Sequence, residues 1–245
     1  MSDTRLCKNC GAAVEDGVRF CSECGADQNQ QEATTVSSTT GNAYTGTPRG
    51  GEKRAIDHIT IGYTVAFEQP MVFLPSVISG ILGLIVTYGL NNIWLGDTLN
   101  TLIGLAISMV SFILSFGSLD MSRDAYYKQP LDLMESIGYV TSRFVVFFIA
   151  AIFGGLLSIT IVFIPIVLFM FVIMVIDETG IMDAFQKSIN VIKSDLVDVL
   201  MLIVLSIVAS FVIGYVPFIS TLLNAVVNVI IAIAFIDIYV TYKAR

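Results

Sequence analysis

The chain has 245 residues, of which 55% are hydrophobic and 13% are charged. Its mean hydropathy of +0.81 excludes an ordinary soluble globular protein and predicts a membrane protein that is mainly α-helical. The formal net charge of −7 lies mostly in the amino-terminal segment and the loops, so it identifies no partner.

All four cysteines of the chain lie within its first 24 residues, as two Cys-x-x-Cys pairs with ten residues between them. The pairs are Cys7 with Cys10 and Cys21 with Cys24. This spacing predicts one structural Zn²⁺ held by four thiolates. A glycine follows each pair and can turn backbone N–H groups toward the sulfur atoms. Because all four ligands come from the protein, no coordination position stays open for catalysis.

Residues 12–20, between the two pairs, are predicted to form a short hairpin with Asp16-Gly17 at its turn. A segment this short cannot bury a core of its own, so zinc would supply its folding energy. Disulfides or a redox dithiol are the alternatives. Two disulfides would need an oxidising compartment, and residues 1–27 contain no apolar signal-peptide stretch.

The segment from Leu6 to Gly25, which reads LCKNCGAAVEDGVRFCSECG, resembles the short zinc ribbon at the amino terminus of many prokaryotic membrane proteins. The resemblance implies a fold but no function, since such ribbons are joined to many unrelated proteins. Residues 1–27 carry three Lys or Arg against five Asp or Glu. Phosphate contacts need a basic surface, so we expect no nucleic acid and favour protein docking or regulation.

Residues 28–54 are rich in Gln, Asn, Thr, Ser and Gly and are predicted to be a disordered linker. A flexible linker of this length spans about 30 Å, which would keep the ribbon near the membrane surface.

Residues 55–245 are predicted to form a six-helix transmembrane bundle of three hairpins. Apolar runs of the length that crosses the hydrocarbon cover residues 71–90, 99–119, 196–214 and 216–236. The run 144–176 is too long for one crossing and short for two.

The distribution of cations favours two crossings for that run. If it crosses twice, every Lys and Arg beyond the ribbon falls on one side, as the positive-inside rule expects. These are Arg49, Lys53, Arg54, Arg123, Lys128, Arg143, Lys187, Lys193, Lys243 and Arg245. We therefore expect a multi-pass protein of the cell membrane with both termini in the cytoplasm, which also keeps the thiols reduced.

An offset of 52 residues aligns residues 135–145 with residues 187–197, with serines at 136/188 and 142/194. A weaker echo occurs at residues 61–63. Each unit is predicted to be an amphipathic interfacial helix followed by a two-span hairpin. Chance similarity of apolar segments is the alternative.

Together with phrases such as IMDAFQKSINVIKS at residues 181–194, this arrangement resembles the glycerophosphoryl diester phosphodiesterase membrane-domain group. The resemblance implies no catalytic residue, because the enzymes of that group carry theirs in a separate soluble domain that this chain lacks.

Catalytic motifs are missing from the sequence, and we expect no enzyme. The single histidine, His58, is expected to be a juxtamembrane surface residue, with a proton relay as the alternative. The acidic residues Asp177, Glu178, Asp183 and Asp195 could hold a metal but are expected to lie in solvated loops.

Uncharged polar side chains repeat along the last span at Ser220, Asn224 and Asn228, a spacing that places them on one helix face. They could line a polar cavity opposite a set of hydroxyls on the second span. That set is Thr101, Ser108, Ser111 and Ser115. The alternative, which we favour, is hydrogen bonding between helices. Small residues at Ser76, Gly80, Gly83, Gly154 and Gly155 indicate close packing.

Three functions remain. We favour a non-enzymatic integral membrane protein whose cytosolic zinc ribbon docks a cytosolic protein or regulates the membrane domain. A carrier or channel for a small or lipid-like solute, using Asn224 and Asn228, is the alternative. A membrane-embedded hydrolase is least favoured, because no nucleophile–base pair is visible.

Overall fold

The computed structural model describes residues 4–6, 13–15, 53–89, 96–215 and 220–245. The chain divides into two units, Met1–Arg49 and Gly50–Arg245. The four cysteines and nearly all of the expected linker lie outside the described residues.

The first unit contains a short antiparallel pair of strands, β1 (Thr4–Leu6) and β2 (Ala13–Glu15), in which Leu6 lies opposite Ala13. The strand pair therefore encloses residues 7–12, the segment that carries the first cysteine pair. The sequence predicted a hairpin over residues 12–20 instead. Its Asp16-Gly17 turn lies outside the described residues, and the strand at Ala13–Glu15 pairs with the chain that precedes the cysteines.

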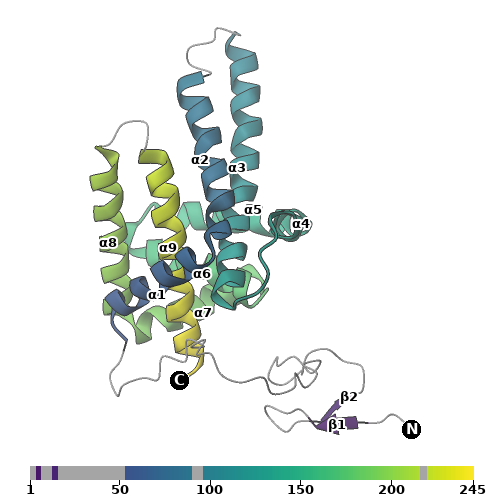
Figure 1. The fold of residues 1–245 in the computed structure, drawn as a ribbon, viewed down its shortest axis with the longest axis vertical. Coiled ribbons are helices and arrows are strands. Elements are labelled where there is room, and N and C mark those ends of the chain that lie inside the picture. Colours follow the sequence, from purple (N-terminus) through teal and green to yellow (C-terminus); the bar gives the residue numbers. More distant parts are fainter. Residues whose placement is uncertain (1–3, 7–12, 16–52, 90–95, 216–219) are drawn as a thin grey trace, which may run out of the picture. The chain divides into compact units, whose positions relative to one another are not determined.

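The described part of the second unit is helical (Figure 1). Its helices are α1 (Ala55–Glu68), α2 (Leu74–Leu84), α3 (Asp97–Tyr126), α4 (Leu133–Ser142), α5 (Phe144–Ser158), α6 (Ile164–Ile176), α7 (Ile181–Ser194), α8 (Leu196–Gly214) and α9 (Ser220–Lys243). A 3₁₀ turn (Pro70–Phe73) leads into α2, a π-helical turn (Ile85–Gly89) continues it, and a second 3₁₀ turn (Ile161–Phe163) precedes α6.

Four helical segments are long and apolar enough to cross a membrane: Pro70–Gly89, Thr98–Tyr126, Leu196–Gly214 and Ser220–Lys243. They coincide with four of the apolar runs identified in the sequence. The number rises to five if α4 and α5, which meet at an angle of 75°, form one bent span.

The six spans expected from the sequence are not reached, because the long apolar run divides into two short helices. The 15 residues of α5 and the 13 residues of α6 rise about 22 and 20 Å. The hydrocarbon is about 30 Å thick. In Figure 1, α5 and α6 do not extend to the upper end of the α2–α3 hairpin.

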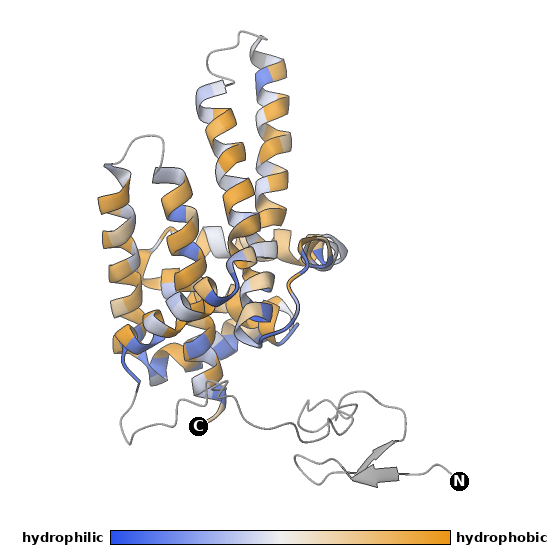
Figure 2. Cartoon of the chain, viewed as in Figure 1, coloured by the Kyte–Doolittle hydropathy of each residue, from blue (hydrophilic) through white to orange (hydrophobic). Residues whose placement is uncertain are grey.

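The orientation of the helices separates polar from apolar residues. The α2–α3 and α8–α9 hairpins run along the long axis of the bundle, while α1 and α7 lie near its lower end (Figure 1). Figure 2 shows hydrophobic residues along the hairpins and hydrophilic residues concentrated near that lower end. This distribution is what a bilayer requires of helices that it surrounds.

The order of the helices repeats three times, as a helix followed by a two-helix hairpin: α1–α2–α3, α4–α5–α6 and α7–α8–α9. The second and third units keep the 52-residue offset at the junction between their first and second helices. The helix α4 ends at Ser142 and α7 at Ser194, while α5 begins at Phe144 and α8 at Leu196. Buried serines occupy equivalent places, Ser136 in α4 and Ser188 in α7. The predicted repeat therefore appears in the order of the helices and at this junction as well as in the residues.

The helix α6 forms the centre of the main apolar core, with eight of its 13 residues buried. Its Phe169 packs edge-to-face on Phe235 of α9, with the ring centroids 5.1 Å apart. On the other side, α5 approaches α6 at Gly154, where a Cβ would lie only 2.8 Å from Val167 Cγ1. The close-packing prediction is confirmed for Gly154, whereas a Cβ at Gly155 would have no atom within 4 Å.

A second close approach joins α1 to α9. Gly62 is buried, and a Cβ at this position would collide with the carbonyl oxygen of Ile230. The nearest atoms all belong to the backbone of α9, so no flexible side chain could move aside to make room. Gly138 occupies the related position in α4, within the Ile-Gly-Tyr sequence common to both helices, and nothing lies within 4 Å of its Cβ position.

Replacing Gly62 by alanine should destabilise the bundle by about 1–3 kcal/mol, because α1 must move away from α9. Gly138→Ala is the matched control, and it should be neutral or slightly stabilising since alanine favours helix. Thermal unfolding in detergent, followed by circular dichroism, measures both. Equal unfolding midpoints for the two variants would show that α1 is not held against α9.

Candidate functional site

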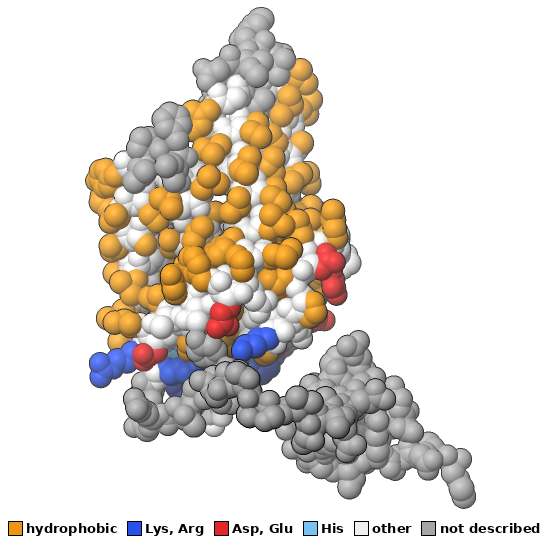
Figure 3. All heavy atoms as spheres, in the orientation of Figure 1, with side chains coloured by type: hydrophobic (Ala, Val, Ile, Leu, Met, Phe, Trp, Pro, Cys, Tyr) orange, Lys and Arg blue, Asp and Glu red, His pale blue; other side chains and the backbone are white. Residues whose placement is uncertain are grey.

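The charged side chains visible in Figure 3 lie in the lower part of the described bundle, while hydrophobic side chains cover most of the visible surface above. We call this end of the bundle the base. Two carboxylates at the base, the buried Asp237 and the partly buried Asp177, organise its hydrogen bonds.

Asp237 of α9 is 1% exposed and accepts hydrogen bonds from three other segments. Its donors are Lys53 Nζ at 3.2 Å, ahead of α1, and Tyr126 OH at 2.6 Å, at the end of α3. His58 Nδ1 of α1 lies 2.5 Å from the second carboxylate oxygen. A buried charge is costly unless it is paired and hydrogen-bonded, and here three side chains share that task.

His58 is therefore not the surface residue that the sequence predicted. It is 4% exposed, since α1 packs on α9 and covers it. Among the described residues, no serine or threonine hydroxyl is hydrogen-bonded to its ring. The His58–Asp237 pair fastens α1 to α9.

Asp177, at the end of α6, has a similar set of partners. It accepts from Tyr239 OH at 2.6 Å, Lys187 Nζ at 2.7 Å and Lys243 Nζ at 3.0 Å. Burial alone would raise the pKa of the Asp177 carboxyl, but hydrogen bonds from Lys187, Tyr239 and Lys243 outweigh burial and hold the pKa below its ordinary value.

The prediction of solvated acidic loops is thus wrong for two of the residues concerned. Asp177 is paired as described, and Asp195 is 8% exposed and lies 2.8 Å from Arg245 Nη1. Glu178 and Asp183 do have exposed side chains. Within the described ranges, no group of three or more His, Cys, Asp or Glu could hold a metal ion.

These contacts join the last helix of each repeat unit in a triangle. Tyr126 of α3 donates to Asp237 of α9, and Tyr239 of α9 donates to Asp177 after α6. Arg123 of α3 closes the triangle by donating to the carbonyl oxygen of Val175 in α6, at 3.2 Å. The three hairpins are therefore tied together where they leave the apolar region.

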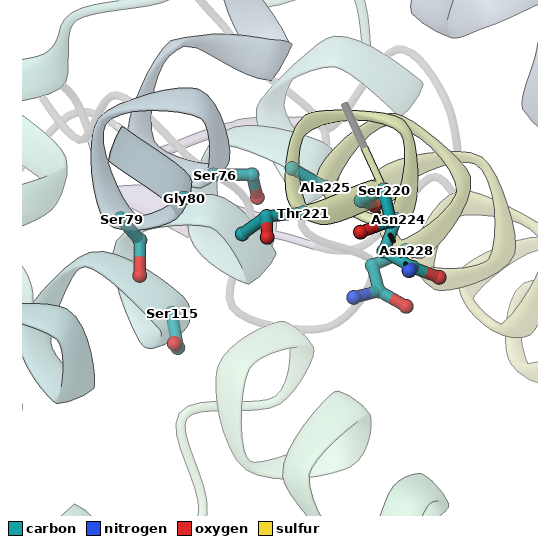
Figure 4. Close-up of a pocket in the computed structure, with 9 residues that line it drawn as sticks. All are labelled: Ser76, Ser79, Gly80, Ser115, Ser220, Thr221, Asn224, Ala225 and Asn228. Atoms are coloured by element: carbon teal, nitrogen blue, oxygen red, sulfur yellow. Dashed lines mark hydrogen bonds between the residues drawn. The ribbon is translucent and has the colours of Figure 1, made fainter. Parts of the chain in front are cut away.

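Above the base, a polar cavity of ≈ 380 Å³ lies between α2, α3 and α9. Its lining consists of Ser76, Ser79 and Gly80 of α2, Ser115 of α3, and Ser220, Thr221, Asn224, Ala225 and Asn228 of α9 (Figure 4). None of these side chains is charged, and seven of the nine carry a hydroxyl or an amide. The cavity can form neutral hydrogen bonds but no ion pair.

A second hollow of ≈ 310 Å³ adjoins the first and shares three of its lining residues, Ser76, Ser115 and Asn228. The remainder of its wall is mostly apolar. It comprises Ser118, Leu119, Leu168, Phe171, Val172, Ser206, Ile231, Ala232 and Phe235. We call the two hollows together the groove, with a polar part and an apolar part.

A bilayer crossed by α9 from the base upward would surround the groove with hydrocarbon. Along α9, Asn228 is nine residues and Asn224 thirteen residues from Asp237. At 1.5 Å per residue these amides stand about 13 and 20 Å above the base, within a hydrocarbon layer of about 30 Å. Polar side chains at this depth are costly unless they are satisfied.

Hydrogen bonds inside the groove satisfy only part of its polar lining. Ser76 Oγ and Ser118 Oγ are 2.6 Å apart and link α2 to α3. Asn224 Nδ2 donates to the carbonyl oxygen of Ser220 in its own helix, at 2.9 Å, and Asn224 Oδ1 is buried without a partner. The favoured explanation of the Ser220, Asn224 and Asn228 spacing required a hydrogen bond between helices. Asn224 instead bonds within its own helix.

The sequence analysis identified part of this site. Ser220, Asn224, Asn228 and Ser115 come together as the cavity hypothesis predicted. Thr101, Ser108 and Ser111 do not line the groove, and Ser108 donates to the carbonyl oxygen of Gly104 in its own helix. Ser79 and Thr221 were missed. The signal for Ser79 was present, since Ser76, Ser79 and Gly80 share one helix face.

In comparisons with known proteins, a match was found for the amino-terminal segment alone. Residues 6–28 match the zinc-ribbon domain. This range contains all four cysteines and agrees with the ribbon predicted over residues 1–27, so the match indicates zinc binding. No curated protein and no solved structure matches the chain. The function of the membrane part must therefore be argued from its own geometry.

Proposed function

We propose that this is a non-enzymatic integral membrane protein whose zinc ribbon, held in the cytosol, docks a cytosolic protein or regulates the membrane bundle. The observation that carries the proposal is the zinc-ribbon match at residues 6–28, on a chain that continues into four apolar helices of membrane-spanning length. The excess of acidic residues in the ribbon favours a protein partner over nucleic acid.

In this proposal, Cys7, Cys10, Cys21 and Cys24 hold one structural Zn²⁺. Four thiols in two closely spaced pairs are the donor set that zinc prefers. The described strands fit such a site, because β1 and β2 pair on either side of the segment that carries the first two cysteines. The bound ion supplies folding energy and no catalysis, since the protein provides every ligand.

We further propose six membrane-embedded segments in three hairpins, each of which enters and leaves at the cytosolic face. The base, with its lysines and arginines, is that face, as the positive-inside rule requires. The α2–α3 and α8–α9 hairpins cross fully. The α5–α6 hairpin is re-entrant, because its helices are short and its tip is apolar, with Ile159, Ile161 and Val162 each 79–80% exposed.

A re-entrant middle hairpin explains the one-sided distribution of Lys and Arg equally well, because it returns Lys187 to the cytosol just as two full crossings would. The resemblance of the bundle to the glycerophosphoryl diester phosphodiesterase membrane-domain group is part of this proposal, and it is supported by the three-hairpin arrangement alone.

Loss of zinc should abolish docking. The full-length protein should carry about one zinc per chain, measured by elemental mass spectrometry, and should retain a cytosolic partner in affinity capture. Cys7→Ser should lose both, whereas Ser22→Ala, within the second cysteine pair but with no ligand changed, should keep both. A partner that Cys7→Ser retains as strongly as wild type would refute docking through the ribbon.

A second candidate function, carriage of a small or lipid-like solute, is favoured by the groove at hydrocarbon depth. Vesicles that contain the protein should swell faster in a glycerol gradient than empty vesicles do. The double variant Asn224→Leu/Asn228→Leu should abolish the increase, and Ser108→Ala should not. Unchanged swelling in the double variant, or no increase with wild type, would refute carriage of glycerol through this groove.

A further inference from the structure

We infer that the groove binds one uncharged amphiphile that bears a free hydroxyl, with the polar end in the polar part and the hydrocarbon chain in the apolar part. This deepens the second candidate function, because it concerns the same groove. It does not depend on the role of the zinc ribbon.

The lining excludes a charged ligand. No Lys, Arg, His, Asp or Glu lines either hollow. An ionised phosphate or carboxylate placed there would lose its hydration without gaining a counter-ion, which is unfavourable at hydrocarbon depth. A phospholipid headgroup would find its cations only at the base.

One buried atom of the lining lacks a hydrogen-bond donor. Asn224 Oδ1 is a buried acceptor that has no partner. A ligand that carried only ester or ether oxygens would bring further acceptors and leave this atom unsatisfied. A hydroxyl group donates to Asn224 Oδ1 and still accepts from the surrounding serine hydroxyls.

The second hollow suits the hydrocarbon chain of the ligand. Phe171 and Leu168 of α6 face Ile231 and Phe235 of α9 across a space of ≈ 310 Å³, which suits methylene groups and would leave a polar ligand unsatisfied. A small polyol without a chain would use only the polar part. An amphiphile matches both parts at once.

The groove opens where its two parts meet. Ser115 and Asn228 line both hollows, and both residues are exposed. At their depth along α3 and α9 the surrounding medium is hydrocarbon, so an amphiphile dissolved in the bilayer reaches the groove sideways without crossing water. Polar groups that face lipid are costly when unoccupied, and the ligand would cover them.

Native mass spectrometry of the full-length protein tests this inference with three defined probes: 1-monooleoylglycerol, methyl oleate and dioleoyl phosphatidic acid. The first has free hydroxyls, the second has the same chain without a hydroxyl, and the third is anionic. Wild type should retain one monooleoylglycerol and should prefer it to each of the other two by about tenfold.

The variant Asn224→Leu should lower retention of monooleoylglycerol about tenfold and should unfold at an unchanged or higher temperature, because it removes an unsatisfied buried acceptor. Asn228→Leu, at the exposed mouth, should also weaken retention without loss of folding. Ser108→Ala, on the same helix as Ser115 but outside the groove, should bind as wild type does.

Equal retention of monooleoylglycerol by wild type and both asparagine variants would overturn the inference. A preference for phosphatidic acid, or equal binding of methyl oleate and monooleoylglycerol, would also overturn it. A dimer that binds none of the probes, because a second copy of the chain covers the groove, would overturn it as well. Binding without glycerol swelling would refute the carrier function and leave the ligand site standing. Swelling without binding would refute the ligand site and leave the carrier function standing.

Discussion

The arrangement of the bundle depends on the hydrogen bonds that join α3, α6 and α9 at the base. Hydrocarbon accepts no unpaired charge, so the carboxylates of Asp237 and Asp177 can stand at its edge only with full sets of donors. Tyr126 and Tyr239 supply one donor to each from a neighbouring helix. Because every donor comes from another part of the chain, satisfying the two carboxylates also fixes which hairpins lie together. The same contacts hold α1 in place through His58.

The groove follows from this arrangement. Once the hairpins are joined at the base, Ser76 and Ser79 of α2 face Asn224 and Asn228 of α9 across a space that no large side chain fills. The close packing of α6 against α9 then lines its lower part with apolar groups. The bundle therefore has two polar regions. The ion pairs of the base hold the hairpins together, and the neutral hydrogen-bonding groups of the groove suit a ligand.

The features that were readable in the sequence depend on local spacing. The cysteine pairs, four of the apolar runs and the common face of Ser220, Asn224 and Asn228 are of this kind. The features that were missed depend on distant partners. His58 meets Asp237 across 179 residues, and no local pattern distinguishes a buried histidine from an exposed one. The cations on either side predicted that residues 144–176 divide into two helices. They did not predict that both helices are too short to cross, because an apolar run has no periodicity that marks where each helix begins and ends.

Labelling of single cysteines from each side of the membrane tests most directly whether the chain returns to the charged base three times. The four ribbon cysteines are the only ones in the chain, so a variant with serine at all four positions provides the background. A membrane-impermeant maleimide should modify Lys193→Cys only from the cytosol and Tyr215→Cys only from outside. It should reach Val162→Cys from neither side until detergent is added. Modification of Val162→Cys from outside would show two full crossings by α5 and α6, and modification of Lys193→Cys from outside would contradict the account as a whole.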